Sequence, residues 1–550
     1  TQSRSSAASD VYKRQLLSTL IMPMSSGILS FSFKSFNFLS LLPAIAHEIS
    51  DPEYLDRAYS TTSFPVNPVA PNITTSYFFD PFMIDFLYKL LTEDYNINSF
   101  FILIVDMFNK IKEFFRVLYE LKYIVPLLRY KFPNPNDNAS LAHSFEKTVK
   151  QFGDKNFIFF ENEAWTYSQI NNSANMLASK LVNDGVNHGD RVVLFMENRP
   201  DYVISILALN KIGAIGVLIN TSLTGQPLIH CINSSYSKKC IFGAELSIPL
   251  SEVLDKINIK NKLDFLWVKD TDDYECPYWA SDLKFQLDAI NINNLAITNK
   301  VTAKDIAFYI FTSGTTGVPK AALFPNVKII AAAVNITKGG YRMNHEDCMY
   351  NCLPLYHSTG MMLGLCACIQ VGASTFIRRK FSASAFWTEV KKYNTTAFVY
   401  VGELCRYLSF QEPSDSEKNN PMSKMVGNGL RPDLWDCFRN RFNVERIVEI
   451  YGASEGNAMF MNLLNKDATI GMTNADIALL EYDVGKDTLV KDEEGKYIEV
   501  DENQPGLLIV KIGPNAVYNG YTDKKASEEK VITGVFNKDD RWFNTGDLVK

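Results

Sequence analysis

The sequence predicts an α/β protein with two doubly wound parallel sheets, followed by a small β-rich subdomain. From about residue 140, apolar strand-like runs such as FIFFE and RVVLFME alternate with helix-like segments such as TYSQINNSANMLASKLVNDG. Repeated βαβ units of this kind build parallel sheets covered by helices on both faces. After residue 476 the pattern changes to short strands and turns, as in IALLEYD and GLLIVKI. We therefore expect an α/β body at residues 140–475 and a β-rich subdomain at residues 476–550.

Residues 1–98 give no assignable domain. The chain begins with Thr1, and its first fifteen residues are polar without a period, which is typical of disorder or of a non-native leader. Residues 16–46 are apolar, but Pro23, Lys34 and Pro43 interrupt them, so they suit a short hydrophobic anchor and show no uninterrupted membrane span. Four prolines in residues 61–82 predict a linker.

Residues 99–139 predict one or two amphipathic helices. Apolar residues recur there at helical spacing, with Lys110, Lys112, Arg116 and Lys122 between them. The basic and aromatic mixture suits a membrane interface, and we expect peripheral association with the cytoplasmic face of a membrane. A helix packed on the α/β body is an equal alternative.

Composition narrows the function. The formal net charge of −6 does not favour nucleic acid as a partner. Nine scattered cysteines without a CxxC pair indicate free thiols in a reducing, intracellular compartment. Six scattered histidines without an HExxH pattern argue against a metal site built by the protein alone. The composition does not indicate an oligomeric state.

The first motif, YIFTSGTTGVPK, is an apolar strand that leads into a loop of hydroxyls and glycines and ends in a lysine. Glycines let the backbone approach phosphate closely, and backbone N–H groups and hydroxyls can then surround polyphosphate oxygens. Ala321 stands where a Walker A loop has its metal-binding hydroxyl, so this is a different phosphate loop. The candidate phosphate-binding residues are Thr312, Ser313, Gly314, Thr315, Thr316, Gly317 and Lys320.

Two further motifs follow predicted strands. EIYGASEG, which begins at Glu449, ends a strand in an aromatic residue, a glycine turn, a hydroxyl and a carboxylate. WFNTGD, which ends at Asp547, places a carboxylate after a turn. Ligands of doubly wound sheets bind at the carboxyl ends of the strands, where such motifs lie.

In this order and spacing, the three motifs resemble the signatures of the adenylate-forming superfamily, which includes acyl-CoA synthetases, luciferases and peptide-synthetase adenylation domains. The resemblance spans roughly residues 140–550, and residues 1–110 match no family. It implies that the loop from Thr312 to Lys320 holds the β- and γ-phosphates of ATP. It also implies that Tyr451 stacks on adenine, Ser454 contacts the α-phosphate, Glu455 holds Mg²⁺ and Asp547 accepts the ribose hydroxyls. Thr312, Lys320, Ser454 and Glu455 are the implied catalytic residues. Ser454 replaces a usual threonine but keeps the hydroxyl, and Asn544 stands where arginine or histidine is common.

Three shorter strings, VGELCRYL, GNGLRPDLW and KFSASAFW, resemble the branch of fatty acid transport proteins and very-long-chain acyl-CoA synthetases. The resemblance implies that the turn Gly427–Asn428–Gly429 lies along the adenine and acyl site. It also places His357, in LPLYHSTG, in the acid pocket, and we add Gly402 and Met361 as substrate-binding candidates. LPLYHSTG offers no carboxylate to pair with an ammonium, which disfavours an amino-acid substrate. Burial of a fatty acid tail is worth ~0.8 kcal/mol per CH₂.

The expected activity is that of a long-chain or very-long-chain fatty acid–CoA ligase that uses ATP, Mg²⁺ and coenzyme A. Three alternatives stay open: a ligase for another acyl or aryl acid, a fatty acid uptake protein that acts without catalysis, and a degenerate fragment. The family's small mobile C-terminal domain starts just after the motif at Asp547, and no residue of 1–550 can be assigned to its lysine. We therefore expect this lid domain to be absent from the chain and the 1–550 polypeptide to have very low ligase activity. The sequence does not indicate the acyl chain length.

Overall fold

The computed structural model describes residues 97–284, 292–312, 319–452, 456–457, 459–502, 504–513 and 516–550. The chain divides into two compact units, residues 1–119 and residues 120–550. Nearly all of the predicted leader, residues 1–96, lies outside the described residues.

A long helix, α5 (Ile97–Leu128), occupies most of the segment predicted to be amphipathic. Phe115 and Tyr119, in the first unit, are 52% and 57% exposed. In the second unit, Ile124 and Leu127 of the same helix are buried. Among the described residues, no helix is both long enough and apolar enough to cross a bilayer.

A buried carboxylate fixes the last turns of α5. Glu120 is 2% exposed and accepts hydrogen bonds from Arg342 and, at 3.2 and 3.3 Å, from Arg446. Arg446 also donates to the carbonyl oxygens of Gly339 and Gly340 in the π-helical segment η7 (Ile336–Tyr341). Because a buried charge needs both a counter-charge and hydrogen bonds, this triad holds the last turns of α5, from Glu120 onward, within the second unit.

The first sheet has seven strands in the order β7-β6-β5-β3-β4-β8-β9, all parallel except β9, which runs antiparallel to β8. The strands are β3 (Arg191–Phe195), β4 (Ile215–Leu218), β5 (Lys239–Gly243), β6 (Phe265–Val268), β7 (Ser281–Asp282), β8 (Ile306–Thr312) and β9 (Lys320–Pro325). β4, β5 and β6 are buried along their whole length, as strands covered on both faces must be.

The second sheet has eight strands in the order β15-β14-β13-β12-β10-β11-β1-β2, parallel except for the edge strands β15 and β2. The strands are β1 (Asn156–Phe160), β2 (Glu163–Thr166), β10 (Cys348–Asn351), β11 (Ser374–Ile377), β12 (Ala397–Val401), β13 (Lys424–Asn428), β14 (Arg446–Tyr451) and β15 (Phe460–Met461).

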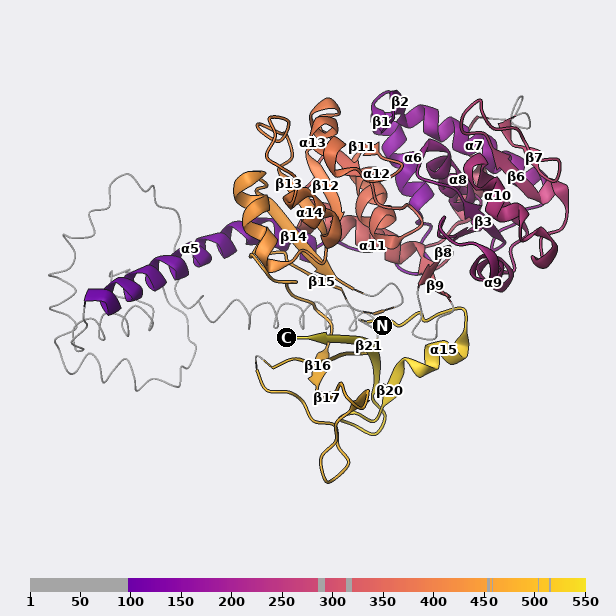
Figure 1. Cartoon of the computed structure of the whole chain (residues 1–550). Helices are drawn as coiled ribbons and strands as arrows, with labels where there is room; N and C mark the ends of the chain where they lie inside the picture. Colours follow the sequence, from indigo (N-terminus) through magenta and orange to yellow (C-terminus); the bar gives the residue numbers. More distant parts are fainter. Residues whose placement is uncertain are drawn as a thin grey trace, which may run out of the picture. The chain divides into compact units, whose positions relative to one another are not determined.

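Helices lie between the two sheets and on their outer faces (Figure 1). The inner helices contact one another and are α6 (Leu141–Phe152), α7 (Tyr167–Asn183), α8 (Pro200–Lys211), α11 (Asn326–Asn335) and α12 (Cys366–Val371). The helices α9 (Gly225–Ser235) and α10 (Ser247–Ser251) cover the first sheet, and α13 (Ala383–Lys392) and α14 (Gly402–Ser409) cover the second. Nearly every residue of α8 is buried, which is expected of a helix enclosed on all sides.

The last part of the chain forms an antiparallel sheet in the order β16-β19-β21-β20. Its elements are β16 (Ile477–Leu480), β19 (Gly506–Lys511), β20 (Val531–Thr533) and β21 (Arg541–Val549), with the hairpin β17 (Tyr482–Asp483) and β18 (Thr488–Leu489) and the short helix α15 (Lys524–Glu529). Two parallel α/β sheets and a small β-rich subdomain confirm the predicted fold class.

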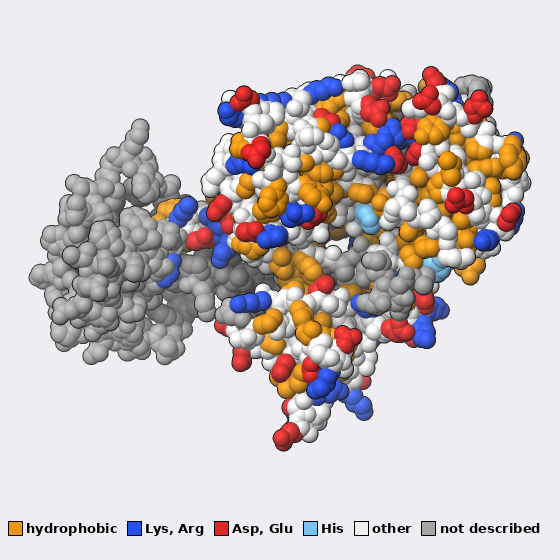
Figure 2. All heavy atoms as spheres, viewed as in Figure 1, with side chains coloured by type: hydrophobic (Ala, Val, Ile, Leu, Met, Phe, Trp, Pro, Cys, Tyr) orange, Lys and Arg blue, Asp and Glu red, His pale blue; other side chains and the backbone are white. Residues whose placement is uncertain are grey.

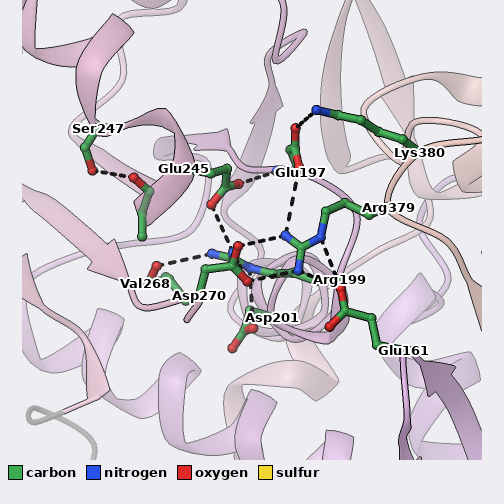
Figure 3. A network of polar contacts seen from close by, with 11 residues as sticks. Glu161, Glu197, Arg199, Asp201, Glu245, Ser247, Val268, Asp270, Arg379 and Lys380 are labelled. Atoms are coloured by element: carbon green, nitrogen blue, oxygen red, sulfur yellow. Dashed lines mark hydrogen bonds and ion pairs between the residues drawn. The ribbon is translucent and has the colours of Figure 1, made fainter. Parts of the chain in front are cut away.

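The carboxyl ends of the two large sheets are joined by an ionic network (Figure 3). Arg199, which follows β3 and is 1% exposed, lies 3.0 Å from Glu245 and 3.1 Å from Asp270. Arg379, which follows β11 of the other sheet, reaches the same Asp270 through two bonds of 2.8 and 3.0 Å. Asp270 is therefore shared by an arginine from each sheet, and the network fixes the sheets against each other. Glu161, Glu197, Asp201 and Lys380 complete it.

The cysteines are free thiols, as expected from the sequence, and the surface drawn in Figure 2 carries charges of both signs. All nine cysteines are free; seven are buried and two, Cys276 and Cys437, are half-buried. On the face drawn in Figure 2, acidic and basic side chains are interspersed.

Candidate functional site

The carboxyl ends of β12, β13 and β14 bring several predicted site residues together. Tyr400, Gly427 and Glu449 face one another across these three parallel strands. The turn Gly427–Asn428–Gly429 continues β13, and Gly402 begins α14 directly after β12. This edge of the second sheet is where a doubly wound fold binds its ligand.

The glycines of this turn are required by close packing. A Cβ on Gly402 would lie 1.7 Å from the carbonyl oxygen of Gly429, and a Cβ on Gly427 would lie 2.1 Å from that of Tyr400. Gly429 has φ +82°, a conformation that L side chains rarely adopt. Gly427 is buried, whereas Asn428 and Gly429 are exposed. The backbone of the turn can therefore meet a ligand without an intervening side chain.

A buried carboxylate that the sequence analysis missed lies under this turn. Glu449 is 4% exposed; it accepts a 2.7 Å hydrogen bond from the Tyr400 hydroxyl and backbone hydrogen bonds from Gly429 and Leu430. Burial raises the pKa of Glu449 to about 7, although the three donors favour its charged form. The signal available in the sequence was a glutamate within the otherwise apolar run Ile447–Ile450.

Tyr451 and Asp547, the residues predicted to bind adenine and ribose, lie in direct contact. The Tyr451 hydroxyl donates to Oδ2 of Asp547 at 2.5 Å, which joins the end of β14 to β21. The Tyr451 ring packs edge-on against Phe460, with 5.7 Å between ring centroids. Ser454 and Glu455 lie outside the described residues, so their predicted roles stay predictions.

The predicted phosphate loop connects two antiparallel strands. Thr312 at the end of β8 pairs with Lys320 at the start of β9, and residues 313–318 between them, which include Ser313, Gly314, Thr315, Thr316 and Gly317, lie outside the described residues. Thr312 Oγ1 is buried and has no hydrogen-bond partner within the described ranges. Lys320 Nζ lies 5.8 Å from the ring centroid of Tyr521. A buried hydroxyl without a partner at the base of the loop fits a site that a phosphate oxygen would complete.

Two residues predicted to bind the acid, His357 and Met361, lie four positions apart but differ in how far their side chains are exposed to solvent. His357 is exposed on the loop after β10, and Met361 is fully buried in the π-helical segment η8 (Thr359–Leu365). η8 contacts β12 and β13, the strands that carry the glycine turn. Asn198, from the end of β3, holds this loop through the backbone of Leu353 and Leu355, each at 2.8 Å.

No group of three or more His, Cys, Asp or Glu side chains within the described ranges is placed to hold a metal ion. Glu455, the predicted ligand, is outside those ranges.

The fold and this site define an α/β protein whose candidate site lies at the carboxyl edge of a parallel sheet. Residues 145–522 match the family model described as AMP-binding enzyme, and the chain belongs to that family. It is 36% identical over 417 residues to the Medium/long-chain-fatty-acid--CoA ligase FadD6 of Mycobacterium tuberculosis, and the match covers 76% of this chain and 67% of the relative. It is 34% identical over 448 residues to the Long-chain fatty acid transport protein 6 of Mus musculus, and the match covers 80% of this chain and 71% of the relative.

Solved structures share the fold. The anthranilate CoA ligase AuaEII in complex with anthranoyl-AMP superposes with a TM-score of 0.64 at 18% identity, covering 77% of this chain and 76% of that one. The long-chain-fatty-acid-CoA ligase FadD1 of Archaeoglobus fulgidus gives a TM-score of 0.60 at 22% identity, covering 76% of this chain and 84% of that one.

Proposed function

We propose that the chain acts in the ATP-dependent ligation of a long-chain fatty acid to coenzyme A through an acyl-AMP intermediate. The observation that carries this proposal is the contact between Tyr451 and Asp547 beside the Gly427–Gly429 turn. Membership of the AMP-binding enzyme family and the names of the two relatives support it.

The adenosine part of the ligand would lie against these residues. The Tyr451 ring offers an apolar face for adenine, and Asp547 offers a carboxylate for ribose. An ionised carboxylate has about four lone-pair sites. Asp547 can therefore accept both ribose hydroxyls and keep the hydrogen bond from Tyr451.

The phosphates would lie at the base of the β8–β9 loop. The Thr312 hydroxyl can donate to a phosphate oxygen, and Lys320 supplies a cation at the opposite strand end. Mg²⁺, when bound at Glu455, would neutralise phosphate charge. In the first step an oxygen of the fatty carboxylate attacks the α-phosphorus, and pyrophosphate leaves. In the second step the CoA thiol attacks the acyl carbon, and AMP leaves as the thioester forms.

The acid would lie along η8, between its apolar side chains and the glycine turn. Met361, Leu363 and Leu365 of this segment are buried. Apolar walls of this kind stabilise an alkyl tail by about 25 cal/mol for each Å² removed from water. A methylene changes selection by only about 1–3 kcal/mol, so the proposal extends to long-chain and very-long-chain acids alike.

Calorimetric titration with hydrolysis-resistant analogues of palmitoyl-AMP and benzoyl-AMP tests the proposal. We expect the palmitoyl analogue to bind more tightly, and Asp547→Ala to weaken its binding at least tenfold, since hydrogen bonds to a charged group contribute about 1.5–3 kcal/mol. Asp539→Ala, at an exposed position of the same subdomain, is the matched control and should bind normally. Tighter binding of the benzoyl analogue would favour a ligase for another acid, and no binding of either would refute the proposal.

Uptake of fatty acids without catalysis is the second candidate, because several relatives are named long-chain fatty acid transport proteins. Cells that express the Glu455→Ala variant separate the two. Uptake of labelled palmitate at the unmodified rate would favour transport, and its loss together with acyl-CoA formation would favour ligation.

We also propose that α5 binds a membrane surface peripherally. Phe115 and Tyr119 are exposed aromatic side chains on a helix that carries Lys112 and Arg116. Aromatic and basic residues together suit the headgroup region of a bilayer. The double variant Phe115→Ser, Tyr119→Ser should lose sedimentation with vesicles that contain phosphatidylserine, whereas Phe410→Ser, at an exposed aromatic of the second unit, should not.

A further inference from the structure

Three side-chain positions form one row beneath the glycine turn. Tyr400, Gly427 and Glu449 are paired across β12, β13 and β14, and they therefore share one face of the sheet. The central residue has no side chain, and a Cβ there would lie 2.6 Å from the Tyr400 ring. The absence of that atom lets the tyrosine hydroxyl meet the glutamate carboxylate across the middle strand, at 2.7 Å.

The same carboxylate also closes the turn that follows the middle strand. It accepts hydrogen bonds from the backbone of Gly429 and, at 3.2 Å, of Leu430. We propose that Glu449 is a positioning residue of the adenylate site, which holds the Gly427–Leu430 turn in its ligand-binding form through these two N–H groups. This inference rests on the proposed function, because it assigns the turn to an adenylate. Glu449 contacts other protein groups and acts on the ligand only through the turn.

The surroundings make the charge of this carboxylate sensitive to pH. The groups that face it are Tyr400 from β12 and Cys405 from α14, with Tyr341 of η7 beyond Tyr400. Burial raises the pKa of the Tyr341 and Tyr400 hydroxyls and of the Cys405 thiol well above their usual values, so all three groups are neutral near pH 7. Burial also raises the pKa of Glu449, to about 7. The carboxylate therefore loses its charge, and its strong hydrogen bonds to the turn, in the pH range where the protein can be assayed.

The test combines two variants at this position. In Glu449→Gln the amide oxygen can still accept from the turn and the amide nitrogen can donate to Tyr400, but nothing titrates. In Glu449→Ala the two backbone N–H groups lose their acceptor. Glu389→Gln is the matched control, because Glu389 also accepts a tyrosine hydroxyl, that of Tyr350 at 2.6 Å, away from the turn.

Two quantities are measured: the Kd of the palmitoyl-AMP analogue between pH 5.5 and 8.5, and hydrogen exchange of the Gly429 and Leu430 amides. For the unmodified protein we expect Kd to rise about tenfold from pH 8 to pH 6, because about a tenth of the carboxylates is ionised one unit below the pKa. Glu449→Gln presents a neutral acceptor at every pH, so it should bind about tenfold more weakly than the unmodified protein at pH 8 and show no further rise in Kd toward pH 6. Glu449→Ala should bind weakly at every pH, with about tenfold faster exchange of the two amides.

Several results would overturn the inference. They are normal affinity and normal amide protection in Glu449→Ala, an unchanged pH profile in Glu449→Gln, or an equal loss of affinity in Glu389→Gln. If Glu449→Ala does not fold, the pH profiles of the unmodified protein and Glu449→Gln decide. An unmodified protein that binds no analogue at any pH would instead refute the proposed function, and with it the role of Glu449 toward an adenylate.

Discussion

Replacement of Arg199 by methionine tests how strongly the ionic network holds the two large sheets together. The guanidinium is 1% exposed and lies 3.0 Å from Glu245 and 3.1 Å from Asp270. Removal of one partner from a buried ion pair costs about 3–5 kcal/mol. Among the described residues, Asp270 would keep Arg379, whereas Glu245 would keep the backbone N–H of Glu197 and lose its arginine. We therefore expect a loss near the lower limit, about 3 kcal/mol.

Urea denaturation at pH 7.5, followed by tryptophan fluorescence, measures this loss. Arg431→Met is the matched control, because Arg431 pairs with Asp433 at the exposed surface, where an ion pair contributes about 0–1 kcal/mol. A loss no larger than that of Arg431→Met would refute the reasoning.

Three further outcomes are expected. Gly402→Ala should lower the affinity for the palmitoyl-AMP analogue at least tenfold, because its Cβ would lie 1.7 Å from the Gly429 carbonyl oxygen. The control Gly513→Ala, whose Cβ would have no other atom within 4 Å, should bind normally in the same titration. Glu120→Gln should lower the free energy of unfolding, measured by urea denaturation, by about 3 kcal/mol. The control Glu113→Gln, at an exposed position, should lower it by less than about 0.5 kcal/mol. Equal losses in the two variants would contradict the stabilising role of the contacts among Glu120, Arg342 and Arg446. The pKa of Glu449 is raised to about 7 in the folded protein, above its value in the unfolded chain. The contribution of Glu449 to the free energy of unfolding is therefore complete below the unfolded-state pKa and is lost as the pH rises through 7. The Tm of the unmodified protein should therefore fall relative to that of Glu449→Gln between pH 5 and pH 8, and parallel curves would contradict the shift.

The parts of the fold that depend on local pattern could be predicted from the sequence. Runs such as VVLF, which follows Arg191 in β3, are apolar throughout because both faces of their strands are covered, so they stand out as buried strands. The turn Gly427–Asn428–Gly429 was identified through the resemblance of its sequence to a family string, and the structure gives the reason for its glycines: close packing at Gly427 and a positive φ at Gly429.

Contacts between distant segments could not be predicted. The role of Glu449 depends on the register that brings it opposite Gly427, and the sequence alone does not fix which strands pair. Asp270 and Arg379 are separated by 109 positions, and nothing local marks them as partners. The sequence pattern of α5 fitted a membrane-facing and a protein-packed helix equally well, and the buried Glu120 shows that the last turns are packed inside the second unit.

The distribution of the cysteines gives the protein its own reporters of local opening. Cys231 and Cys240 lie in the core that covers the first sheet, and Cys352 and Cys405 lie in the core that covers the second. A buried, protonated thiol does not react with alkylating reagents until the structure around it opens. Alkylation under native conditions, followed by peptide mass mapping, would therefore time the opening of each sheet separately. Equal rates at the four thiols would show that the two sheets open as one cooperative unit.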